Sequence, residues 1–275
     1  MSTININGVE LFYKESGIGP ETIVFSHGLL MDHTMFEVQR AAFESQYRVI
    51  AYDHRAQGQS ADPGRDYDMD TIAADAAAFV EALHAAPCHF AGLSMGGFAG
   101  MRLAARRREL VRSLTLMNTG ANREPASGRL RYNFLAQLVK IVGTAPFTGI
   151  AVKELFGCST RNSTDPAIQK MLSDWTEKLR RRPTSIARSL LGVMNRPEFS
   201  PQELSAIRCP TLVIAGEEDT AQPPSNSEKL AAVIPGATLV RIAACGHSSS
   251  LEAPQAVANA MREFIEGKSR SAGQQ

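Results

Sequence analysis

Residues 90–97 read FAGLSMGG, with a serine between glycines at the point where an apolar run ends. The apolar run predicts a buried strand, and the residues after it have helical spacing, so Ser94 lies where a strand turns directly into a helix. Such a turn can hold a nucleophile in strained backbone geometry with its hydroxyl exposed. Gly92 and Gly96 suit the turn because a Cβ at either position would crowd it. Ser94 could instead be a simple helix N-cap, so the residues elsewhere in the chain must decide.

Short apolar runs and helical patterns alternate on both sides of this stretch. Runs rich in β-branched residues, TIVFSHG at 22–28 and YRVIAYD at 47–53, predict buried strands. The pair Asn7-Gly8 between two alternating runs predicts an N-terminal hairpin. Alternation of this kind is typical of a parallel sheet with crossover helices, so we expect an α/β fold.

The alternation breaks between about Thr119 and Pro201, where helical patterns follow one another with no strand-like run between them. It resumes with PTLVIAGEED at 210–219. A helical block inserted into an alternating pattern predicts a cap over the core rather than an independent domain. We therefore expect an α/β core of residues 1–118 and 201–268, a helical cap (lid) of residues 119–200, and a flexible tail of residues 269–275.

The composition excludes several classes of function. The chain has 275 residues, 44% of them hydrophobic, and a net charge of +1, which gives no electrostatic basis for binding nucleic acid. It contains no apolar run long enough for a membrane span and no signal-peptide pattern, so we expect a cytoplasmic protein. The four cysteines have neither zinc-site nor disulfide-framework spacing, and we expect no metal.

Polar residues follow the expected strands, at the sheet edge where function gathers in open α/β folds. They are His27, Asp53, Ser94, Asn118, Asp219 and His247. A serine nucleophile needs a base within reach, and His247 in CGHSSSLEAP lies in a loop past the last strand. The base needs an acid to hold its tautomer. We prefer Asp219 over Glu217 and Glu218 because it lies furthest past its strand and has a short side chain.

An oxyanion hole needs two backbone N–H groups aimed at one point. The residue after the nucleophile, Met95, supplies one. The early loop SHGLLMD supplies the other from Leu29, since Gly28 permits a sharp turn there. Both assignments follow from position alone.

Five segments together, SHG, DHRAQGQS, GLSMGG, GEEDTAQPP and CGHSSSLEAP, resemble the α/β-hydrolase superfamily over essentially the whole chain except the cap. The resemblance implies a mostly parallel eight-stranded sheet flanked by helices, with an inserted helical cap. It also implies a triad of Ser94, Asp219 and His247 and an oxyanion hole at Leu29 and Met95. Ala56 departs from the family's pattern, which usually has glycine there. If that position needs a positive φ, alanine costs about 1 kcal/mol.

Within the superfamily the chain is similar to small carboxylesterases, enol-lactone hydrolases and cofactor-free perhydrolases. We therefore expect a serine hydrolase that cleaves carboxylic ester or lactone bonds through an acyl-enzyme, without a cofactor. Ser94 excludes the branches that use an aspartate nucleophile. Alternatives are a carbon–carbon bond hydrolase, a perhydrolase using the same triad, or a small-molecule receptor.

The substrate is expected to be small and largely apolar, because apolar and aromatic residues flank the nucleophile and recur in the cap. The sequence does not fix the natural substrate or the oligomeric state. The residues expected to line the substrate pocket are His27, Gly28, Leu30, Phe98, Phe134 and Trp175.

Overall fold

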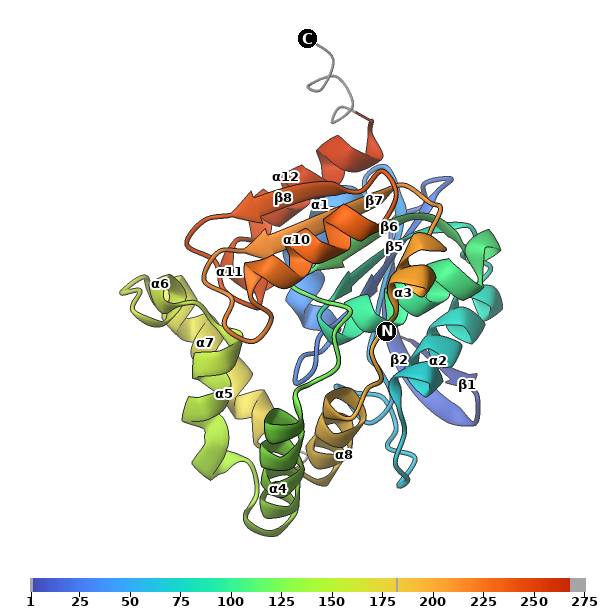
Figure 1. Cartoon of the computed structure of the whole chain (residues 1–275). Coiled ribbons are helices and arrows are strands. Elements are labelled where there is room, and N and C mark those ends of the chain that lie inside the picture. Colours follow the sequence, from blue (N-terminus) through green and yellow to red (C-terminus); the bar gives the residue numbers. More distant parts are fainter. Residues whose placement is uncertain (1, 182, 268–275) are drawn as a thin grey trace.

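The computed structural model describes residues 2–181 and 183–267. An eight-stranded sheet with the order β1-β2-β4-β3-β5-β6-β7-β8 runs through its centre (Figure 1). β2 pairs antiparallel with β1 and β4, and all other neighbours are parallel. The mostly parallel eight-stranded sheet is therefore confirmed. The strands are β1 Ser2–Ile6, β2 Val9–Ser16, β3 Thr22–Ser26, β4 Arg48–Tyr52, β5 Cys88–Leu93, β6 Val111–Met117, β7 Thr211–Gly216 and β8 Thr238–Ile242.

Helices connect and cover the strands. In the core they are η1 His33–Phe36, α1 Glu37–Phe43, α2 Met69–Ala82, α3 Met95–Arg106, η2 Arg108–Leu110, α9 Pro201–Ser205, α10 Pro224–Val233, α11 Ser249–Glu252 and α12 Pro254–Ile265. Between β6 and α9 they are α4 Ala126–Val142, η3 Ala145–Phe147, α5 Thr148–Leu155, α6 Cys158–Arg161, α7 Pro166–Leu179 and α8 Pro183–Met194.

The turn between β1 and β2 is the predicted hairpin. Asn7 and Gly8 both have positive φ, 50° and 77°, as a two-residue hairpin turn requires. The antiparallel partners run from Ile6 opposite Val9 outward. An Asn-Gly pair adopts these angles at little cost, and this is why local sequence sufficed to predict the turn.

Helices cover both faces of the sheet. Along β3 and β4, Val24 and Ile50 pack into the cluster shared with α2 and α3, whereas Ile23 and Val49 pack into the cluster shared with α1 and α12. Because side chains alternate between faces, a strand covered on both sides must be apolar throughout. This explains the continuous apolar runs in the sequence.

The helices from α4 to α8 form a separate layer beyond the sheet (Figure 1). α4 packs against α8, and α5 packs against α7. Within the described residues, no strand lies between β6 and β7. The short helices α6 and α9 were not predicted, because four or five residues are too few to show helical periodicity.

Polar contacts attach this layer to the sheet. The Trp175 indole Nε1 of α7 donates to the Leu30 carbonyl at 3.0 Å. The Tyr67 hydroxyl, in the segment before α2, lies 2.6 Å from the Ser189 hydroxyl of α8. Both contacts are at the loops that follow the central strands, so the helical layer covers that edge of the sheet.

The division into a core of residues 1–118 and 201–268 and a cap of residues 119–200 remains our proposal. The expected tail, residues 269–275, lies outside the described residues. None of the helices in the described ranges has the length and apolarity needed to cross a membrane.

Candidate active site

Ser94 lies in a strained turn between β5 and α3. Its backbone has φ 51° and ψ −107°, a region that residues other than glycine rarely adopt. The chain closes so tightly that a Cβ on Gly96 would lie 2.0 Å from the Ser26 carbonyl oxygen, and one on Gly92 would lie 2.3 Å from the Gly96 backbone. The Ser94 side chain makes no capping hydrogen bond to α3. Its hydroxyl is therefore free for another role.

His247 is oriented by Asp219. The His247 Nδ1 lies 2.9 Å from Oδ2 and 3.1 Å from Oδ1 of the Asp219 carboxylate. Both side chains are almost fully buried. With Nδ1 donating to the carboxylate, a neutral imidazole keeps its lone pair on Nε2 and can accept a proton there.

Two further groups hold the Asp219 carboxylate. The Asn118 side-chain amide donates to Oδ2 at 3.0 Å, and the Gln222 backbone N–H donates to Oδ1 at 2.8 Å. The Asn118 amide also donates to the Gly246 carbonyl at 3.0 Å, next to His247. One amide thus links the loops that carry the acid and the base.

The two competing acids have other surroundings. Glu217 is exposed at the end of β7. Glu218 accepts a hydrogen bond from the Ser159 backbone N–H at 2.8 Å. The Ser159 hydroxyl also donates to this carboxylate at 2.5 Å. The hydrogen bond from the hydroxyl, followed by the one from the N–H, lowers the pKa of Glu218. Glu218 therefore attaches the α6 helix to the core, while Asp219 faces the imidazole.

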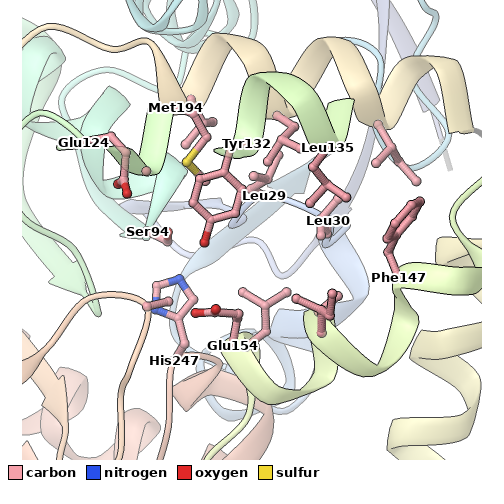
Figure 2. A pocket seen from close by; sticks show the side chains of 18 of the residues that line it. Leu29, Leu30, Ser94, Glu124, Tyr132, Leu135, Phe147, Glu154, Met194 and His247 are labelled. Carbon is pink, nitrogen blue, oxygen red and sulfur yellow. The ribbon is translucent and has the colours of Figure 1, made fainter. Parts of the chain in front are cut away.

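Ser94 and His247 line the same cavity, and the imidazole lies beside the serine side chain in Figure 2. Within the described chain the Ser94 hydroxyl makes no hydrogen bond. Contacts between nucleophile and base are often long without substrate and shorten when it binds.

The backbone N–H groups of Leu29 and Met95 have no hydrogen-bond acceptor within the described chain. Leu29 follows β3, and Met95 begins α3, whose positive helix end favours negative charge. The two N–H groups lie at the ends of neighbouring strands, because β3 and β5 are paired in parallel. They are the donors available for an oxyanion.

Hydrogen bonds of the buried His27 ring hold the loop that carries Leu29. Its Nδ1 lies 2.7 Å from the Gly28 carbonyl, and its Nε2 accepts from the His54 backbone N–H at 3.0 Å. Burial lowers the pKa of His27, so the ring is neutral and can accept through Nε2. Gln57 completes the support by accepting from the Leu30 N–H at 3.1 Å.

The loop after β4 has a positive φ at Ala56, the position where the resembling family usually has glycine. Ala56 has φ 63°, the left-handed region where glycine is usual, and its N–H donates to the Ala61 carbonyl at 2.9 Å. Asp53 accepts from the backbone N–H groups of His33, at 2.6 Å, and Gln59, at 2.8 Å. The loop therefore keeps its left-handed conformation at Ala56, although alanine adopts a positive φ less readily than glycine.

The cavity has a volume of about 300 Å³. Ser94 and His247 lie at one end and Phe147 at the other (Figure 2). Its larger polar lining residues, besides His247, are Glu124, Arg131, Tyr132, Glu154, Arg196 and Gln222. The apolar lining comes from Leu29, Leu30, Phe98, Leu135, Val139, Phe147, Ile150, Leu155, Leu179, Ile186, Leu190, Val193 and Met194.

Leu30 and Phe98 lie in this lining as expected, but four residues expected there do not. His27 is fully buried beneath the loop, and Gly28 packs against Leu93. Phe134 is 65% exposed because α4 turns that side outward. Trp175 lies behind Leu30 and lines a second cavity of about 700 Å³. Proximity in sequence and apolar character do not determine which face of a helix is turned to the cavity.

The sequence analysis gave no role to three residues of the candidate site. Asn118 was noted only as a polar residue at a strand end. Tyr132 and Arg196 line the cavity but gave no signal, since one lies in a helical pattern and the other before a proline. Within the described ranges, no three His, Cys, Asp or Glu side chains are grouped so that they could hold a metal ion.

Comparisons with known proteins place the chain in a family. The model of the alpha/beta hydrolase family matches residues 23–260. The chain is 28% identical to 3-oxoadipate enol-lactonase 2 of Acinetobacter baylyi over 96% of each chain. It is 29% identical to the putative carbamate hydrolase RutD of Pseudomonas syringae over 89% of this chain and 93% of that one.

Solved structures are similar over almost their whole length. A thermophilic esterase from Thermogutta terrifontis has a TM-score of 0.88 and 27% identity, covering 97% of this chain and 98% of its own. The enol-lactonase from Burkholderia xenovorans also has a TM-score of 0.88, with 26% identity, covering 96% of this chain and 100% of its own. Because the family model matches residues 23–260 of the 275, the chain belongs to the alpha/beta hydrolase family.

Proposed function

We propose that the protein is a serine hydrolase that cleaves carboxylic ester or lactone bonds of small, largely apolar substrates. The observation that carries the proposal is one cavity lined by both Ser94 and His247, with Nδ1 of His247 held by Asp219. A buried, oriented imidazole beside a strained serine has the parts of an activated nucleophile.

In the proposed reaction, His247 Nε2 takes the Ser94 hydroxyl proton as the oxygen attacks the carbonyl carbon. The negative charge that develops on the carbonyl oxygen is held by the N–H groups of Leu29 and Met95. Protonated His247 then donates its proton to the leaving alkoxide oxygen, and the acyl group stays on Ser94. Water, deprotonated by His247, releases the acid and restores the serine.

The relatives support this chemistry. The similar proteins include two described as enol-lactonases and one described as an esterase, and the fold and coverage are shared nearly end to end. Another is described as a putative carbamate hydrolase, which would attack a related carbonyl. The apolar lining of the cavity supports small apolar substrates.

The test is hydrolysis of p-nitrophenyl esters of increasing acyl length by the wild-type protein and by Ser94→Ala. We expect Ser94→Ala to lower kcat by at least about 10⁴-fold, because the attacking oxygen is lost. Ser205→Ala, which removes an exposed hydroxyl from α9, serves as the control and is expected to retain wild-type turnover.

A serine-reactive phosphonate separates the possible outcomes. Labelling of Ser94 without ester turnover would indicate a working nucleophile with a different substrate, such as a carbon–carbon bond or peroxide. Full turnover in Ser94→Ala would overturn the proposal. Ligand binding without labelling or turnover would instead support a receptor.

A further inference from the structure

Three arginines are buried in the described part of the chain, and they differ in their partners. Arg55 is 3% exposed and its Nη2 donates to the Asp75 carboxylate at 2.6 Å. Arg102 is 2% exposed and its Nε donates to the Asp70 carboxylate at 2.9 Å. Arg196 is 5% exposed and forms no ion pair within the described residues. The fold thus pairs two of its buried guanidinium groups and leaves the third without a carboxylate.

The contacts of Arg196 leave most of its hydrogen-bonding capacity unused. Its Nη1 donates at 3.0 Å to the carbonyl of Val193, in the last turn of α8. Its Nε is buried without an acceptor. The guanidinium carbon lies 4.2 Å from the centroid of the Phe98 ring, which holds the group in place.

This unpaired group lines the same cavity as the nucleophile. Arg196 and Phe98 both line the cavity with Ser94, and the Phe98 backbone N–H donates to the Ser94 carbonyl at 2.9 Å. One aromatic ring therefore connects the guanidinium to the turn that carries the nucleophile.

Arg196 carries its charge near neutral pH. Burial lowers the pKa of Arg196 to about 10, and Arg102 contributes in the same direction, while Glu124 opposes the shift. Glu124 lines the same cavity but forms no ion pair with Arg196. A buried charge without a hydrogen-bonded counter-charge is costly, so an anionic ligand would relieve that cost.

We propose that Arg196 binds a carboxylate carried by the substrate, remote from the bond that is cleaved. The inference rests on the proposed function and makes the substrate a half-ester of a dicarboxylic acid, whose ester bond is cleaved while its free carboxylate is bound by Arg196. A single negative charge matches the one unpaired guanidinium.

The kinetic test compares half-esters with their diesters. Monomethyl and dimethyl esters of linear diacids from succinate to suberate are offered to the wild type, Arg196→Gln and Arg196→Lys. The readout is selectivity, kcat/KM for the half-ester divided by kcat/KM for the diester. We expect Arg196→Gln to lower this ratio by about tenfold or more, because a hydrogen-bonded ion pair is lost. Arg196→Lys should restore part of it, since the charge returns without the planar group.

One further variant is a control, and a second tests the other arginine of the cavity. Arg180→Gln removes an exposed charge just after α7, and we expect no change in the ratio. Arg131→Gln removes the other arginine of the lining, which already pairs with Glu154 at 3.0 Å. An unchanged ratio in Arg196→Gln, with or without lower thermal stability, would overturn the proposal and leave Arg196 only its packing against the Phe98 ring. A ratio that falls in Arg131→Gln alone would overturn it too.

Direct binding separates this proposal from the hydrolase proposal. Hexanoate and hexanamide are titrated calorimetrically into Ser94→Ala and into Ser94→Ala/Arg196→Gln. We expect hexanoate to bind the first protein at least tenfold more tightly than hexanamide, and this preference to vanish in the second. Equal binding of acid and amide to Ser94→Ala would overturn the carboxylate site even if esters are hydrolysed. If the protein prefers hexanoate but hydrolyses no ester, the carboxylate site at Arg196 is supported and the proposed hydrolase function is contradicted.

Discussion

The Asn118 side-chain amide donates to the Asp219 carboxylate at 3.0 Å and, through the same nitrogen, to the Gly246 carbonyl at 3.0 Å. One nitrogen at the end of β6 thus holds both the acid and the residue before the base. Asn118 also has a positive φ of 49°, which asparagine tolerates better than most residues. The backbone conformation and the side-chain chemistry therefore favour the same residue type.

Asn118→Gly is expected to lower kcat about tenfold with little change in KM, because it keeps the backbone free to adopt positive φ but loses a hydrogen bond to a charged group. Asn118→Asp should lower kcat further, since it would place a second carboxylate beside Asp219. Steady-state kinetics on a p-nitrophenyl ester measures both. Wild-type activity in Asn118→Asp would contradict a positioning role for the amide.

Ser94→Gly and Ser94→Ala separate strain from chemistry. Both variants lack the hydroxyl and should be inactive, but only glycine adopts φ 51° without strain. We expect Ser94→Gly to be more stable than Ser94→Ala by about 1 kcal/mol, read as the difference in urea unfolding free energy. Equal stability of the two variants would show that the turn stores no strain at Ser94.

Gly96→Ala is expected to be destabilised by about 3 kcal/mol or more. Its Cβ would lie 2.0 Å from the Ser26 backbone carbonyl, which cannot move without displacing β3. The matched control is Gly149→Ala in α5, where no atom lies within 4 Å of the new Cβ. Alanine there should stabilise the protein by about 0.5 kcal/mol. Thermal melts of the two variants should move in opposite directions.

The buried histidines predict a loss of stability as the pH falls. Burial lowers the pKa of His54 well below its usual range, and burial also lowers the pKa of His27 and of His89. Below about pH 6.5 the unfolded chain therefore binds protons that the folded chain does not. The stabilisation is complete above pH 6.5 and is lost as the pH falls from there toward the folded pKa, by up to about 1.4 kcal/mol per pH unit for each histidine.

Urea unfolding between pH 7.5 and pH 5.5 measures this slope. The window lies above the range in which carboxylates titrate, so the histidines dominate it. We expect His54→Gln to reduce the slope, whatever it does to stability at pH 7.5. His84→Gln, at an exposed position after α2, should leave the slope unchanged. A wild-type slope in His54→Gln would mean that His54 is protonated in the folded protein.

Local sequence determined much of this protein. The hairpin at Asn7-Gly8, the apolar strands and the turn at Ser94 each follow from residues next to one another, because turn angles and side-chain periodicity are local properties. A positive φ at Ala56 was only a conditional expectation, and it rested on the glycine that the resembling family usually has there. The α/β alternation could therefore be predicted from the residues alone, whereas the α/β-hydrolase fold and the roles expected of Ser94, Asp219 and His247 rested also on the resemblance of five short segments.

Only the tertiary structure decided what surrounds the site. Phe134 faces solvent and Trp175 supports Leu30 from behind, because the rotation of each cap helix depends on the helices packed against it. Arg196 gave no local signal, since a missing partner is a property of everything that packs around a side chain. Residues adjacent in the chain set the strands and turns, whereas long-range packing set the cavity and left one buried charge in it without a counter-charge.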